Sequence, residues 1–172
     1  MSPKTFLFPV LYSSLIIAAT CITFYGGHSK SINAVSIIGL LLVIPFCVFA
    51  MIYSKRVIHN NIIGGKDLVK EGLKFVIFST VILVIFQALF FTIDFRDYKV
   101  DFIQTYGFEL AKKQIKNGNL KITEAQIPDL IQKEINQVTL FKECTSIVFK
   151  NMILGTITSV ITAVALRANL RG

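Results

Sequence analysis

Four long apolar segments divide this 172-residue chain and constrain its fold more than any other feature. They cover residues 5–26, 32–53, 73–93 and 146–166. A helix that crosses the hydrocarbon core of a bilayer needs ~20 mostly apolar residues, and each segment has about that length. Charged residues make up 16% of the chain, against about 25% in ordinary proteins, too few to coat a soluble protein with four buried helices. The sequence predicts an all-α membrane protein with four transmembrane helices, a single membrane domain over residues 1–172.

The charges at the segment ends predict the orientation. Four spans place the N-terminus, the 54–72 loop and the C-terminus on one side of the membrane. That side carries Lys4, Lys55, Arg56, Lys66, Lys70, Lys74, Arg167 and Arg171, opposed by Asp67 and Glu71. The 27–31 loop carries only Lys30, and the nearly neutral 94–145 loop is long enough to translocate whatever its charge. By the positive-inside rule, we expect both termini in the cytoplasm.

The net charge of +8 is therefore interpreted mainly as an orientation signal, with weak attraction to anionic lipids. No nucleic-acid partner is expected. The first segment also resembles a signal peptide, and Ala18-Ala19-Thr20-Cys21 resembles a lipoprotein cleavage site. Ala18 and Thr20 depart from the usual residues of such a site, and the apolar run continues to Tyr25, so a retained span is favoured.

The 94–145 loop predicts two amphipathic helices on the extracytoplasmic side. Apolar residues recur at helical spacing from Phe102, and Asn117-Gly118 is typical of a left-handed helix stop. Thr123 and Gln126 fit a capping box for the second helix, which we expect to run almost continuously into the fourth span. The apolar faces of the two loop helices could cover the membrane plane, each other or a partner protein. The sequence does not choose among them.

Small residues along the fourth span predict close helix packing. Gly155, Ser159 and Ala163 follow one another at intervals of four, so they share one helix face. Such a stripe lets two helix backbones approach, which replaces the hydrophobic drive that lipid does not supply. Ser14 and Ala18 form a shorter version on the first span. The stripe is expected either to pack within the protein's own bundle or to contact another subunit.

Gln87 lies well inside the third span, where an amide is expected to orient helices through a hydrogen bond. Lys150 interrupts the fourth segment and is expected within the outer end of its helix, reaching back to the surface. No acidic or basic residue lies at mid-depth, whereas pumps and coupled transporters usually carry one there. The spacings of common catalytic, metal and phosphate motifs are missing too. We therefore expect no catalytic residues, cofactor or metal.

Three further stretches carry a resemblance to a known family. Gly64 to Gly72 form a glycine-bounded amphipathic segment before the third span, and Thr123-Glu124-Ala125-Gln126 lie in a polar helical insert. A fourth span beginning near Gly155 then ends in the basic tail Arg167 to Arg171. In these features the chain resembles domain-of-unknown-function family 4199, small four-span bacterial membrane proteins. Asp94-Phe95-Arg96 stands where that family often has a proline. The resemblance implies a bacterial inner-membrane location and supplies no mechanism.

The sequence favours a non-enzymatic accessory or scaffold subunit. Its expected contacts are the fourth span and the outer loop helices, and its expected partners are membrane lipids and either another membrane protein or a second copy. The alternative is a small channel or carrier whose path runs near Pro45 and Gln87.

Overall fold

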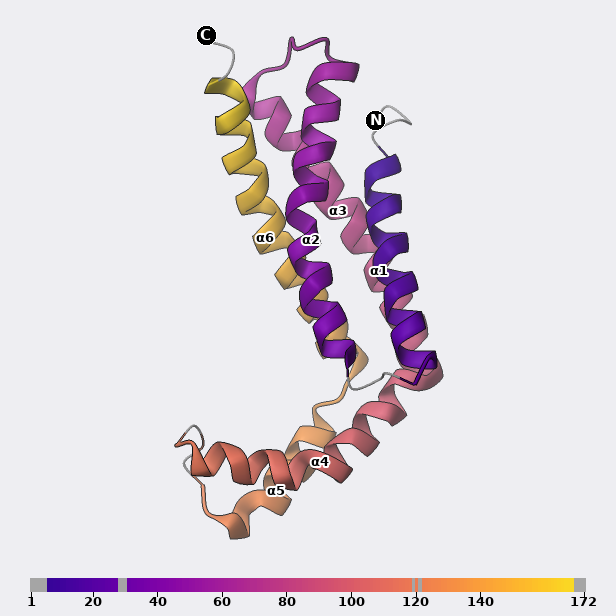
Figure 1. Ribbon diagram of the computed structural model, residues 1–172, viewed down its shortest axis with the longest axis vertical. Coiled ribbons are helices and arrows are strands. Elements are labelled where there is room, and N and C mark those ends of the chain that lie inside the picture. The colour runs from indigo at the N-terminus through magenta and orange to yellow at the C-terminus, as the bar shows by residue number, and fades with distance from the viewer. Residues whose placement is uncertain (1–5, 28–30, 119, 121, 169–172) are drawn as a thin grey trace. The chain divides into compact units, whose positions relative to one another are not determined.

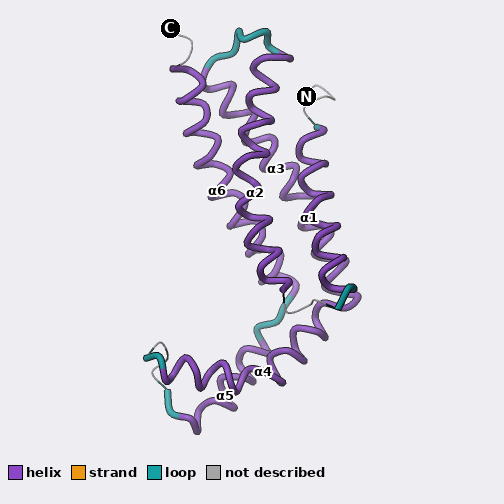
Figure 2. Tube along the Cα trace, in the orientation of Figure 1, coloured by secondary structure: helices purple, strands orange, loops and turns teal. Residues whose placement is uncertain are grey.

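The computed structural model consists of helices joined by short connections throughout its described residues (Figures 1 and 2). It describes residues 6–27, 31–118, 120 and 122–168. Residue 5, where the first predicted span begins, and the charged residues Lys4, Lys30 and Arg171 lie outside that description. The elements are α1 (Leu7–Tyr25), α2 (Ile32–Tyr53), η2 (Ser54–Ile58), α3 (Gly65–Phe90), η3 (Phe91–Phe95), α4 (Arg96–Lys116), η4 (Glu124–Gln126), α5 (Ile127–Asn136) and α6 (Leu140–Ala168).

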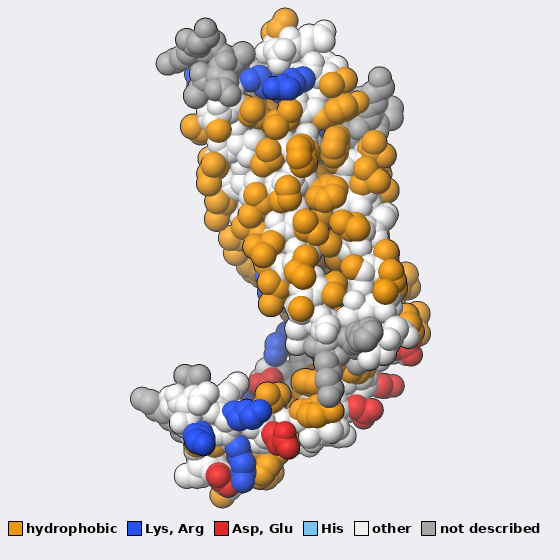
Figure 3. Space-filling view, viewed as in Figure 1, with side chains coloured by type: hydrophobic (Ala, Val, Ile, Leu, Met, Phe, Trp, Pro, Cys, Tyr) orange, Lys and Arg blue, Asp and Glu red, His pale blue; other side chains and the backbone are white. Residues whose placement is uncertain are grey.

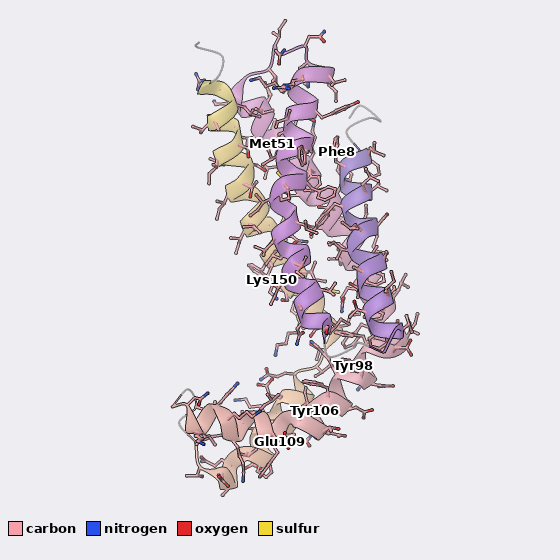
Figure 4. All side chains as sticks on the ribbon, viewed as in Figure 1. Phe8, Met51, Tyr98, Tyr106, Glu109 and Lys150 are labelled. Atoms are coloured by element: carbon pink, nitrogen blue, oxygen red, sulfur yellow. The ribbon has the colours of Figure 1, made fainter. Side chains whose placement is uncertain are left out.

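Four of these helices are long and apolar enough to cross a membrane, which confirms the prediction of four spans. They are α1, α2, α3 and α6. Helices suit this role because each satisfies its backbone hydrogen bonds internally, where lipid offers none. α2 continues through Pro45, whose side chain lies on the exposed side of the helix. Lys150 lies inside α6, as expected (Figure 4).

The chain packs as two compact units. The first contains Met1–Phe86 and Ile147–Gly172, and the second contains Gln87–Ser146. The prediction of a single membrane domain stays a prediction. In the first unit, α1, α2, α3 and α6 surround a core of buried apolar side chains. Its members include Tyr12, Val43, Cys47, Met51, Phe75, Val76, Leu83 and Ala163.

The outer faces of the first unit are apolar as well. Large apolar side chains are exposed on all four of its helices, and they cover the face seen in Figure 3. Ile22 of α1 is 72% exposed, and Val164 of α6 is 66% exposed. A water-soluble bundle would expose polar side chains at these positions, whereas lipid favours apolar ones. Burial and composition therefore agree on a membrane-embedded bundle.

The second unit is built around α4 and α5, which lie side by side. Ala111 of α4 and Ile127 at the start of α5 are buried, and Gly107 of α4 faces Ile131 of α5. A Cβ at Gly107 would lie 3.3 Å from Ile131 Cγ1. Each helix therefore covers part of the other's apolar face. Lys99 on α4 also pairs with Glu143 at the start of α6.

The predicted start and stop signals of the loop helices are confirmed. Asn117 ends α4, and Gly118 follows with a positive φ of 71°. Thr123 N donates to Gln126 Oε1 over 3.0 Å in the predicted capping box. The expected continuous run from α5 into the fourth span is wrong. α5 ends at Asn136, and Thr139 Oγ1 accepts a hydrogen bond from Lys142 N, so α6 begins with its own cap.

Candidate functional site

The small-residue stripe of α6 lies against α3 inside the first unit. A Cβ added to Gly155 would clash with Val76 Cγ2 and lie 2.7 Å from Val76 Cγ1. One turn along, a Cβ at Gly72 of α3 would lie 2.8 Å from Ser159 Cβ. Real Cβ atoms do not approach other atoms so closely. The two helix backbones therefore come together only because glycine stands on each side of the crossing.

Polar and sulfur atoms connect this crossing to α2. Ser159 Oγ donates to Gly155 O over 2.7 Å within α6. The same hydroxyl lies 3.4 Å from Cys47 Sγ of α2. Met51, one turn further along α2 (Figure 4), is fully buried, and its Sδ lies 3.9 Å from Cys47 Sγ. Three helices thus meet at Ser159, and Ala163 of the same stripe is buried next to them.

Ser14 and Ala18 do not take part in this packing. Both are exposed on α1, so the shorter stripe of the first span does not meet the stripe of α6. The neighbouring face of α1 points inward instead. Ser13 Oγ donates to Ser79 O over 3.3 Å, and the Tyr12 hydroxyl donates to Gly39 O over 3.0 Å. A role for Ser14 and Ala18 in contacting a partner stays a prediction.

Gln87 and Pro45, which mark the path of the alternative hypothesis, occupy different surroundings. Gln87 is partly buried at the start of the second unit. Pro45 is exposed on α2, in the first unit. Val43 and Cys47, on the inward side of α2, are almost completely buried and fill the centre of the bundle.

The end of the first unit where α2 stops and α3 begins is rich in cations. Lys55 is only 7% exposed, and its Nζ donates to Leu166 O over 2.7 Å. That carbonyl belongs to the last turn of α6, whose backbone acceptors have no partner within the helix. A lysine near a helix C-terminus satisfies such an acceptor and favours the helix dipole. Lys55 therefore ties the end of α2 to the end of α6.

Two ion pairs lie in the first turns of α3. Lys70 Nζ lies 2.8 Å from Asp67 Oδ1, and Lys74 pairs with Glu71. The hydrogen bond from Lys70, followed by its charge, lowers the pKa of Asp67, which precedes the apolar stretch of α3. Both acidic residues of this end are thus engaged with lysines on their own helix.

Comparison with known protein families identifies the family of this chain. The model of the family described as "Protein of unknown function (DUF4199)" matches residues 7–168. The chain belongs to this family. A search of curated proteins and a search of solved structures find no match.

Two motifs by which the sequence resembles DUF4199 have structural roles in this chain. The segment from Gly64 to Gly72 begins α3, and its last glycine makes the close approach to Ser159. Thr123 and Gln126 form the capping box before α5. From the sequence, Gly72 was identified only as part of a family feature, and the place of Gly72 and Cys47 at the crossing was not predicted. A sequence signal for Gly72 was available, because Ser79 follows two turns later and the two small residues therefore share one face of α3.

The second unit of this DUF4199 protein carries an aromatic column along α4. Phe95, Tyr98, Phe102 and Tyr106 follow one another with ring centroids 6.2, 6.1 and 5.1 Å apart (Figure 4). Lys99 Nζ lies 5.2 Å from the Phe95 ring centroid. Large apolar side chains are also exposed in this unit. Phe141 is 80% exposed and Leu110 is 45% exposed.

Across the described residues, no three His, Cys, Asp or Glu side chains come together as a metal site would require.

Proposed function

We propose that this protein is a non-enzymatic accessory or scaffold subunit of the bacterial inner membrane. Both termini would lie in the cytoplasm, and the second unit, Gln87–Ser146, would contact the partner from the opposite side. The partner would be another membrane protein or a second copy of the chain. Location and orientation rest on the family and on the positive-inside rule.

The observation that carries the proposal is the exposure of large apolar side chains in the second unit. This segment is rich in charge, unlike the four apolar spans, yet Phe141 and Leu110 remain open to the surroundings. Aromatic and large apolar side chains at exposed positions are common anchors of protein contacts. The proposal therefore assigns the contact to the second unit.

We expect the fourth span to contribute less to partner contact than its small-residue stripe alone would indicate. Its small-residue stripe already packs against α3, so a partner would meet the opposite face of α6. That face carries Ile157, Ile161 and Val164, all more than half exposed. In lipid this face needs no partner, and we therefore give it the smaller role.

The channel or carrier hypothesis has less support. A path near Pro45 would run along an exposed side of α2, whereas the bundle centre beside it is filled by packed side chains. Solute flux in reconstituted vesicles that is lost on Gln87→Leu would favour this alternative over the scaffold role.

Native purification in several mild detergents tests the proposal. We expect a complex of fixed stoichiometry, which Phe141→Ala together with Leu110→Ala weakens at least tenfold. Ile85→Ala, at a 58% exposed position of α3 in the first unit, is the control and should leave the complex intact. Recovery of a monomer alone in every detergent would overturn the proposal. The mass of the complex distinguishes self-association from a second protein.

A further inference from the structure

At the end of the first unit where α2 stops, three exposed cations of the described chain form no ion pair with a described acidic residue. They are Arg56, Lys66 and Arg167. Asp67 and Glu71 are already paired with Lys70 and Lys74, and the buried Lys55 is bonded to Leu166 O.

The packing of helix ends gathers these three cations in one region. The Lys55 contact holds Leu166, and therefore the adjacent Arg167, next to the segment that carries Arg56. Arg167 also lies across the start of α3, because a Cβ at Gly65 would be 3.6 Å from its Cδ. Lys66 follows Gly65 directly. Figure 3 shows Lys and Arg side chains at this end of the bundle.

Apolar side chains accompany the cations. Val57, next to Arg56, is 53% exposed, and Ile62 in the loop before α3 is 86% exposed. Below them begin the apolar outer faces of the spans. Cations next to exposed apolar groups are suited to the boundary between phosphate headgroups and acyl chains.

We propose that Arg56, Lys66 and Arg167 bind the headgroup of an anionic phospholipid, whose acyl chains lie along exposed apolar side chains of the spans such as Phe49 and Val164. The phosphate accepts hydrogen bonds from the two guanidinium groups, and the lysine adds a point charge. Lys55 positions this surface by fixing the end of α6. This inference is independent of any protein partner of the second unit.

Native mass spectrometry of the full chain in a mild non-ionic detergent tests the proposal. The probes are phosphatidylglycerol and phosphatidylcholine with identical acyl chains. Each basic residue near an anionic lipid surface contributes about fivefold to binding, so replacing three should weaken binding about a hundredfold. We expect retained phosphatidylglycerol on the wild-type protein and its loss from the Arg56→Gln, Lys66→Gln, Arg167→Gln variant. Phosphatidylcholine should be retained weakly by both.

The control variant, Lys113→Gln, Lys116→Gln, Lys133→Gln, removes the same charge from exposed positions of the second unit and should retain the lipid. A second variant, Arg56→Lys with Arg167→Lys, keeps the charge and should also retain it, which guards against a loss caused by misfolding. The proposal is overturned by equal retention of the two lipids, by unchanged retention in the triple glutamine variant, or by equal loss in the control. Displacement of the lipid by millimolar inorganic phosphate would instead indicate a site for a soluble phosphate ligand and would also overturn it.

Discussion

The crossing of α3 and α6 predicts a large effect from a small substitution, Gly155→Ala. The added methyl group would point at Val76, which is completely buried, and would lie 2.7 Å from its Cγ1 atom. Valine is branched at Cβ and has little rotamer freedom in a helix, so it cannot swing away. The two helices would have to separate, and the bond network at Ser159 would loosen with them.

The size of the effect follows from two opposing terms. Alanine is favoured over glycine in a helix interior by ~1 kcal/mol. Overpacking a close-packed interior costs about 1–3 kcal/mol. Because the clash involves a rigid side chain, we place Gly155→Ala near the upper end of that range and expect a net loss of ~1–2 kcal/mol. Gly39→Ala is the matched control, since its Cβ would lie 3.1 Å from Ile16 Cδ1, the flexible tip of that side chain, and 3.4 Å or more from Cγ2 and Cγ1, which is ordinary contact. It should be neutral or slightly stabilising.

Equilibrium unfolding in mixed micelles of a mild detergent and dodecyl sulfate, followed by circular dichroism, measures these changes. The double variant Gly155→Ala, Val76→Ala removes both methyl groups of Val76 that would clash. It should lose less stability than the two single variants lose together. We expect a coupling free energy of ~1 kcal/mol or more in that direction. Equal stability of Gly155→Ala and the wild type, or strict additivity in the double variant, would refute the close crossing.

Three further outcomes are expected. Thr80→Val removes a buried hydroxyl that has no hydrogen-bond partner among the described residues, so it should leave stability unchanged or raise it by up to ~1 kcal/mol in the same titration. Lys55→Met keeps the apolar stem but loses the charged donor to Leu166 O, and it should cost about 1–2 kcal/mol; an unchanged midpoint would contradict the role of that contact. In a cysteine-free background, Asn117→Cys should react with an impermeant maleimide from outside, and Asn61→Cys only after permeabilisation. The reverse pattern would invert the proposed orientation.

The positions of the spans were predictable because an apolar run is a local signal. The start of α3 was predictable too. The apolar span was predicted from residue 73 and the stretch from Lys66 to Gly72 as a helix start, and both belong to one helix that begins at Gly65. Asp67 with Lys70, and Glu71 with Lys74, pair at a spacing of three and support that first part of the helix.

The candidate site was predictable only in part. The spacing of Gly155 and Ser159 indicated a close helix contact, but the identity of the neighbouring helix depends on Gly72 and Val76, far away in the sequence. On α1 the inward hydroxyl belongs to Ser13, whereas the small-residue spacing indicated Ser14. The two neighbouring serines carry the same side chain, so only the packing of the other helices decides which one faces inward.

The most direct test of the intramolecular stripe uses the contact between Cys47 and Ser159. Cys47 Sγ lies 3.4 Å from Ser159 Oγ, so Ser159→Cys would bring two sulfur atoms together in the bundle. The experiment oxidises this variant in native membranes with Cys21 and Cys144 replaced by alanine, followed by non-reducing electrophoresis and mass spectrometry. We predict a disulfide between α2 and α6 within one chain and a band at the monomer position. A disulfide-linked dimer joined through residue 159, with Cys47 left reduced, would contradict the account.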